Sequence, residues 1–261
     1  MMAEELLEIP AGFRENEYAV LKGFFPRALL RDYRAFLERA LAEEVWPVFR
    51  RVGLDPQDPE LPTRVAHLIE HDPQLTPINK QLLLGHFPLA VRLSDAINPI
   101  AQFMGASPLL KALLHTDALF MHMPPMARFV PPRYASAAVP PHQDISYNTH
   151  MGEFLVLWMP LVPIDHECGG LVMYRGGHHN VHAIDSAAHG WLSPIDVAEF
   201  ERHPLVGLEL GDAVVFSPRV VHASAGNTSN RIRLSVDVRL FGAETRSSKH
   251  HMNLDTLDTQ A

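Results

Sequence analysis

The chain has 261 residues, of which 47% are hydrophobic, and a formal net charge of −8. This composition suits one globular domain over residues 1–261 and disfavours nucleic acid or an anionic membrane as the main partner. No apolar run reaches the length of about 18 residues that a membrane-spanning helix needs, and the single cysteine, Cys168, cannot form an internal disulfide, so we expect a protein of the reducing cytoplasm.

The first half of the chain has the pattern of helices. After Pro26, apolar residues recur at helical spacing up to Pro47, with charged residues between them. Residues 51–76 are interrupted by prolines and are expected to form loops and short turns. The helical pattern returns over residues 77–115, so a helical N-terminal part is expected over about 17–115.

The second half of the chain has the pattern of strands. From about residue 117, short apolar runs appear between Gly, Pro, Asn and Asp residues. In the clearest run, residues 232–240, apolar residues occupy every second position. The polar residues of this segment share the opposite face: Arg231, Arg233, Ser235, Asp237 and Arg239. Such alternation predicts a strand with one buried face and another that lines solvent or a polar site.

The order of these patterns predicts the fold class. Helices followed by strands indicate an α+β protein, in which helices pack on an antiparallel sandwich or barrel. The strand-rich core is expected over about 117–242. Residues 244–261 are polar and are expected to form a loose tail.

His142 and Asp144, separated by one residue, form a candidate metal-binding pair. In an extended segment both side chains lie on one face, because strand side chains alternate. A third ligand, His222, follows the apolar run 213–216, and an antiparallel sheet could bring the segments together. Two imidazoles and a carboxylate are the ligands of non-haem Fe(II) oxygenases, whereas a structural zinc site normally closes four positions. With 16 histidines and 30 acidic residues in the chain, the pair alone is weak evidence.

Further motifs surround this pair in a fixed order. They are Pro141-His142-Gln143-Asp144, Leu157-Trp158-Met159-Pro160-Leu161, Glu167-Cys168-Gly169-Gly170-Leu171, Arg175-Gly176-Gly177-His178, Gly211-Asp212 and the segment from His222 to Asn227. Through them, residues 140–241 resemble the phytanoyl-CoA dioxygenase (PhyH-like) family of Fe(II)/2-oxoglutarate-dependent oxygenases. Cys168 and Gly177 depart from the Asn and Ser that this family often has in two turns.

The resemblance implies a double-stranded β-helix, the jelly-roll or cupin-like core, with flanking N-terminal helices. It implies that His142, Asp144 and His222 bind Fe(II) and are catalytic. Arg233 follows His222 by 11 residues, where the family has the arginine that binds 2-oxoglutarate. Arg231 shares its strand face and is the alternative. The related halogenases have Ala or Gly in place of the ligand carboxylate, so Asp144 argues against chlorination.

Other side chains are candidates for the co-substrate and substrate sites. Trp158 could line the 2-oxoglutarate pocket or pack in the core, and Ser224 could contact the co-substrate or cap a loop. Arg128, Arg133 and Tyr134 precede the ligand motif and are candidates for substrate contact, with a plain surface location as the alternative.

Together these features predict an enzyme that uses Fe(II), 2-oxoglutarate and O2 to hydroxylate a small-molecule metabolite, with release of succinate and CO2. Desaturation or oxidative demethylation by the same iron chemistry is an alternative. A cupin-like metal enzyme that does not use 2-oxoglutarate is another, and a non-catalytic binder that has kept the fold is a third, which the intact triad disfavours. A monomer and a homodimer are both compatible with the sequence.

Overall fold

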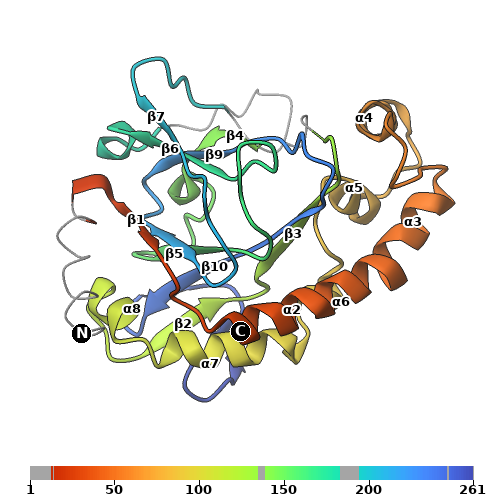
Figure 1. The fold of residues 1–261 in the computed structure, drawn as a ribbon. Helices are drawn as coiled ribbons and strands as arrows, with labels where there is room; N and C mark the ends of the chain where they lie inside the picture. Colours follow the sequence, from red (N-terminus) through yellow and green to blue (C-terminus); the bar gives the residue numbers. More distant parts are fainter. Residues whose placement is uncertain (1–12, 14, 135–138, 183–193, 246, 261) are drawn as a thin grey trace.

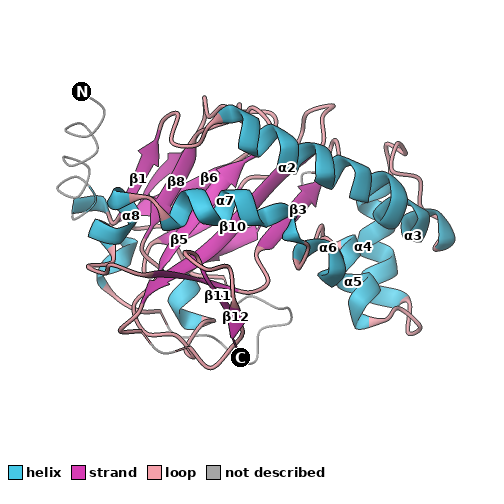
Figure 2. Cartoon of the chain, turned by 90° about the horizontal axis from the view of Figure 1, so that it is seen from below, coloured by secondary structure: helices cyan, strands magenta, loops and turns pink. Residues whose placement is uncertain are grey.

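Two antiparallel sheets form the centre of the molecule, and helices cover the outer face of the larger one (Figures 1 and 2). The computed structural model describes residues 13, 15–134, 139–182, 194–245 and 247–260. Within these residues the sheets do not close into a barrel. The α+β class predicted from the order of the elements is confirmed.

The helices come first along the chain. Their bounds are α2 (Arg27–Ala40), α3 (Trp46–Arg51), α4 (Leu61–His71), α5 (Pro77–Leu83), α6 (Leu89–Arg92), α7 (Asn98–Gly105) and α8 (Pro108–Leu113). A π-helical turn, Leu41–Val45, joins α2 to α3, so the helix continues beyond Pro47. Pro47 lies in the first turn of α3, directly after this π-helical turn, and its ring nitrogen cannot donate to the preceding turn of the continuous helix.

The helix α4 corrects one expectation. Residues 51–76 were expected to form loops because prolines interrupt them, yet Leu61–His71 is helical. Pro62 lies in the first turn, where proline is tolerated, and Leu61 and Val65 bury one side of the helix. None of the described helices is long and apolar enough to cross a membrane.

The larger sheet has the strand order β1-β8-β5-β10-β2-β11-β12, and β3 also pairs with β10. Its strands are β1 (Tyr18–Leu21), β2 (Leu119–His122), β3 (Met126–Val130), β5 (Leu155–Pro160), β8 (Ala213–Phe216), β10 (Arg233–Gly242), β11 (His251–Asn253) and β12 (Thr259–Gln260). The smaller sheet has the order β4-β9-β6-β7, from β4 (Val139–His142), β6 (Leu171–Arg175), β7 (Glu201–Pro204) and β9 (Val221–Ser224).

The strand β10 is central to the larger sheet, where it pairs with β5 on one side and with β2 and β3 on the other. Its polar residues point into a cavity, as the alternation of the sequence predicted. Because side chains alternate, its apolar residues project from the opposite face, over which α2 and α7 lie (Figure 2).

The expectation of a loose tail over residues 244–261 is wrong. The strand β11 pairs antiparallel with β2, with Met252 opposite Met121. Leu254 is 1% exposed, packs against Gly105 at the end of α7, and donates its N–H to the carbonyl of Leu119 at 3.0 Å. The tail thus forms hydrogen bonds with backbone groups that the edge of β2 would otherwise leave unpaired. A strand of only three residues, such as β11, has no sequence pattern by which it could be predicted.

Replacement of Leu254 tests whether the tail belongs to the core. Leu254→Ala is expected to lower the free energy of unfolding by about 2–4 kcal/mol, because it leaves a cavity beside α7. Chemical denaturation followed by circular dichroism measures this change. Ile78, which is 74% exposed, provides the control, and Ile78→Ala should change stability by less than about 0.5 kcal/mol. Equal small effects in both variants would support a loose tail.

Candidate active site

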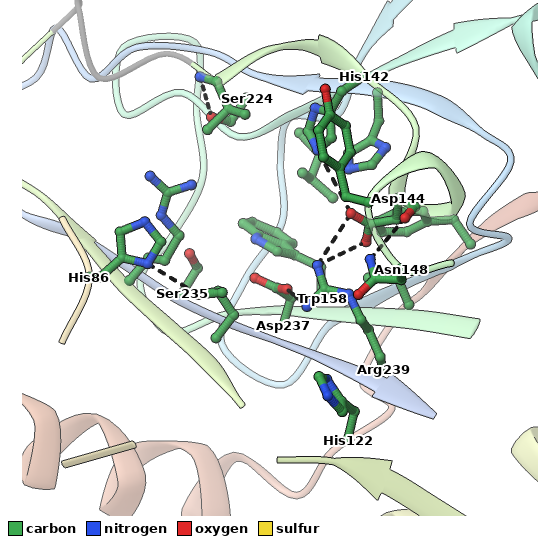
Figure 3. A pocket seen from close by; sticks show the side chains of 18 of the residues that line it. His86, His122, His142, Asp144, Asn148, Trp158, Ser224, Ser235, Asp237 and Arg239 are labelled. Carbon is green, nitrogen blue, oxygen red and sulfur yellow. Dashed lines mark hydrogen bonds and ion pairs between the residues drawn. The ribbon is translucent and has the colours of Figure 1, made fainter. Parts of the chain in front are cut away.

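A cavity of about 410 Å³ lies between the two sheets (Figure 3). Residues from both sheets line it, and so do side chains from the helical half of the chain. The three candidate metal ligands are among the lining residues, and Figure 3 shows His142 and Asp144 on one side of the cavity. A cavity of this size is typical of a small-molecule site.

Strand pairing brings the two candidate histidine ligands together. His142 ends β4, His222 lies in β9, and the two are direct partners in the antiparallel register. Side chains of directly opposed residues project from the same face, so the ring centroids are only 4.2 Å apart although the residues are 80 positions apart. Both side chains are buried.

Backbone carbonyls orient both imidazole rings. The Nδ1 atom of His142 lies 2.9 Å from the carbonyl oxygen of Pro140, and that of His222 lies 3.0 Å from the oxygen of Val220. A carbonyl only accepts, so Nδ1 carries the proton in both rings and Nε2 keeps its lone pair. Burial, together with the nearby His222, lowers the pKa of His142 to about 3, and burial also lowers the pKa of His222. Both rings are therefore neutral at pH 7, which is the form that binds a metal.

Asp144 completes the cluster. It begins a 3-10 turn directly after β4, and its backbone carbonyl accepts a hydrogen bond of 2.8 Å from the side chain of Asn148. One ligand atom from each of His142, Asp144 and His222 lies within 4.8 Å of the other two. Two imidazole nitrogens and a carboxylate oxygen at this separation could hold one metal ion, and the donor set suits Fe(II).

Arg239 of β10 holds the carboxylate of Asp144 in place. Its Nη2 atom donates to both carboxylate oxygens at 3.2 Å, and its Nη1 atom lies 3.7 Å from Asp237 (Figure 3). Burial would raise the pKa of Asp144, but the positive charge of Arg239 and its hydrogen bonds to the carboxylate outweigh burial and hold that pKa below its usual range. Asp144 is therefore ionised and oriented. The sequence predicts Arg239 only as a member of the polar face of its strand and does not indicate its contact with Asp144.

Arg233 lies at the start of β10, on the same polar face. Its Nη1 atom donates to the carbonyls of Ala225 at 2.8 Å and Gly169 at 3.4 Å, and no described residue forms an ion pair with it. Burial, with the charge of Arg128 added, lowers its pKa to about 10, so the guanidinium is still charged at pH 7. A buried cation without a counter-ion is unfavourable until an anion binds. Arg231, the alternative in the sequence, is exposed and ion-paired with Asp165.

The structure divides the other predicted site residues into two groups. Trp158, Ser224 and Arg128 line the cavity, and the Oγ atom of Ser224 accepts a hydrogen bond of 3.0 Å from the backbone of β4. Arg133 and Tyr134 do not line it. Arg133 is exposed and donates to Asn230 at 3.0 Å, whereas Tyr134 is buried in the hydrophobic core.

Several cavity residues were not found from the sequence. They are His86, Arg92, His122 and Lys249, with Asp237 and Ser235 known only as members of the polar strand face. Three of the four lie outside the motif-bearing segment 140–241 on its N-terminal side, and Lys249 lies in the segment expected to be a loose tail. No local pattern marks them, because only tertiary packing brings them to the cavity.

The family comparison decides the class of protein. The family model described as phytanoyl-CoA dioxygenase (PhyH) matches residues 13–235. The chain belongs to this family. The prediction of a 2-oxoglutarate-dependent non-haem iron enzyme that acts on a small molecule is thereby confirmed. No curated protein matches this PhyH-family sequence.

Solved structures share the fold of this PhyH-family protein. SnoN, a non-haem α-ketoglutarate-dependent epimerase from nogalamycin biosynthesis, has a TM-score of 0.62 and 17% identity, over 94% of this chain and 86% of its own. EvdO2 from Micromonospora carbonacea var. aurantiaca, complexed with 2-oxoglutarate, has a TM-score of 0.52 and 19% identity, over 90% and 89%. At such low identity they establish the fold, and the predicted jelly-roll core is confirmed.

Asp237 makes the free energy of unfolding of the metal-free protein depend on pH. Burial raises its pKa to about 6, although Arg239 lies nearby. The folded state then binds more protons than the unfolded state between about pH 4 and pH 6, so this group makes the metal-free protein less stable as the pH rises through that window. Asp237→Asn removes the effect. The free energy of unfolding of the variant, minus that of wild type, should increase by roughly 1–3 kcal/mol from about pH 4 to pH 7. Denaturation at several pH values measures it, and a constant difference would contradict a raised pKa.

Proposed function

We propose that this PhyH-family enzyme hydroxylates a small-molecule metabolite, using Fe(II), 2-oxoglutarate and O2 and releasing succinate and CO2. The observation that carries the proposal is one cavity with a buried His142, Asp144 and His222 cluster and a buried arginine, Arg233, without a counter-ion. Bound Fe(II) would supply the activation of O2, coupled to oxidative decarboxylation of 2-oxoglutarate.

The protein's own residues divide the work of binding and orientation. The Nε2 atoms of His142 and His222 and a carboxylate oxygen of Asp144 hold the metal, and Arg239 keeps that carboxylate ionised. Arg233 binds the distal carboxylate of 2-oxoglutarate, since a guanidinium group matches the two oxygens of a carboxylate. Trp158 and Ser224 border the same space. Apolar side chains such as Val156, Leu171 and Phe216 form the rest of this wall and limit access of water.

Solved structures with this fold are described with more than one type of reaction. SnoN is described as an epimerase and SnoK, with a TM-score of 0.52 and 18% identity over 90% of this chain and 83% of its own, as a carbocyclase. The same fold thus hosts outcomes other than hydroxylation, and desaturation or demethylation stays an alternative. Arg233 disfavours a metal enzyme that does not use 2-oxoglutarate.

The buried free thiol of Cys168 supports a reducing, cytoplasmic setting for a monomer or homodimer.

Loss of a metal ligand tests the centre. Anaerobic addition of Fe(II) and 2-oxoglutarate to the wild-type protein should give a visible charge-transfer band, and Asp144→Ala or His222→Ala should abolish both this band and Fe(II)-dependent succinate formation. The exposed residue His67 on α4 provides a matched control, and His67→Ala should behave as wild type. Full activity in either ligand variant would show that the ligand assignment is wrong.

Replacement of Arg233 tests the co-substrate site. Arg233→Gln should raise the concentration of 2-oxoglutarate required for half-maximal succinate formation by the equivalent of about 2–5 kcal/mol, because a buried charge pair is lost. Titration of the band or of succinate release with 2-oxoglutarate measures the change. Arg231→Gln is the control, and its requirement should stay near wild type. The opposite pattern would transfer the role to Arg231.

A further inference from the structure

The cavity has more positive charge than the proposed reaction needs. We propose that the substrate carries an oxyanion group, a carboxylate or a phosphate, and that Arg92 and Arg128 bind it in the cavity wall. This inference rests on the proposed function, because it takes Arg233 to be occupied by 2-oxoglutarate.

The lining of the cavity carries an excess of positive charge. Among the described residues, five cationic side chains line the cavity and only two carboxylates, Asp144 and Asp237, oppose them. The cations are Arg92, Arg128, Arg233, Arg239 and Lys249. Fe(II) and the 2-oxoglutarate dianion carry equal and opposite charges, so their binding leaves the excess unchanged. Like charges in a site shielded from water repel strongly, and an anionic ligand relieves that repulsion.

The five cations differ in whether they already have a partner or an assigned role. Arg239 contacts both carboxylates, Arg233 is assigned to 2-oxoglutarate, and Lys249 is exposed. Arg92 and Arg128 form no ion pair with any residue that the structure describes. Asp237 faces three guanidinium groups at once, those of Arg239, Arg128 and Arg92, and one carboxylate cannot neutralise all three.

Arg92 and Arg128 both have hydrogen-bond donors that the protein does not use. The Nη2 atom of Arg128 on β3 donates to the carbonyl of Leu84 at 3.2 Å, and the Nη1 atom of Arg92 on α6 lies 3.5 Å from the sulfur of Met126, a weak acceptor. The Nε atoms of both arginines are buried without a hydrogen-bond partner. Each guanidinium is thus positioned by one contact and keeps donors for an oxyanion.

The position of His86 supports the same location for the anion. Burial, followed by the charges of Arg128 and Arg92, lowers its pKa to about 3, so this ring is neutral and lies beside both cations. Figure 3 shows His86 across the cavity from His142 and Asp144. A substrate held there by its charged end would place its uncharged part toward the metal ligands, which is the orientation that oxidation of a specific carbon needs.

The test uses the intact protein loaded anaerobically with Fe(II) and saturating 2-oxoglutarate. The charge-transfer band is recorded first, and its absence from the wild type would overturn the proposed function itself. Sodium sulfate or sodium acetate is then titrated, and binding is followed by the rise in the midpoint of thermal unfolding. Tighter binding of sulfate would indicate a phosphate group in the substrate, and tighter binding of acetate a carboxylate.

Three variants decide the assignment. Arg92→Gln and Arg128→Gln should each weaken binding of the preferred anion at least tenfold while the band is kept, and Arg92→Lys should recover part of the affinity because it keeps the charge. Arg231→Gln, a surface arginine outside the cavity, should bind the anion as wild type does. If Arg128→Gln fails to fold, Arg92→Gln decides alone, since its side chain is only half-buried. A wild type that keeps the band but binds neither anion, or unchanged affinity in the Gln variants, would overturn the inference and leave the proposed function standing.

Discussion

The antiparallel pairing of β4 with β9 is the constraint on which the site depends. It places His142 directly opposite His222, and contacts close to each strand orient the two imidazole rings. Each imidazole is oriented by the carbonyl two residues before it, and Asp144 follows in the turn that ends β4. A register slip of one residue would turn one imidazole to the opposite face of the sheet, because strand side chains alternate. The register of the smaller sheet therefore sets the geometry of the candidate metal site.

The larger sheet supplies the charges that face this centre. Alternation along β10 directs Arg233, Ser235, Asp237 and Arg239 into the space between the sheets. Buried charges are unfavourable unless they are paired, and here Arg239 links Asp144 to Asp237. The helical layer on the other face of the sheet buries a large apolar core, which offsets the cost of a charged interior. The side chains of β10 that face the cavity and those that pack in the apolar core thus project from opposite faces of this strand.

The sequence was most informative where a short-range pattern reports on structure. The two faces of β10 followed from strict alternation, and the triad and Arg233 followed from motifs whose order resembles that of a known family. Prediction failed where tertiary contacts decide. β11 has only three residues and exists because β2 offers it a free edge. Arg92 reaches the cavity from α6 through packing alone.

Two of the candidate substrate residues, Arg133 and Tyr134, lie away from the cavity for a related reason. Arg133 and Tyr134 were expected near the cavity because they precede His142 in the chain. The strand β3 ends at Val130, and Arg133 adopts a left-handed backbone conformation with φ of 57°. Beyond the end of the strand the alternation of side chains no longer applies. Arg133 is exposed, whereas Arg128, still within the strand, lines the cavity. Closeness in sequence is a poor guide to closeness in space once the strand has ended.

The two arginines proposed to bind the substrate come from different elements. Arg128 lies in β3, which pairs with β10, whereas Arg92 lies in α6. His142, His222 and Arg233 lie in strands and Asp144 lies in the 3-10 turn after β4, whereas Arg92 and His86 come from the helical half of the chain. A change at Arg92 alters the charge of the cavity without disturbing the pairing of β4 with β9. Solved structures less than 20% identical to this chain share its fold, although their descriptions differ in the reaction performed. On the proposed function, the strands would position the metal ligands and Arg233, and the charge of Arg92 and Arg128 on the far wall would select the substrate.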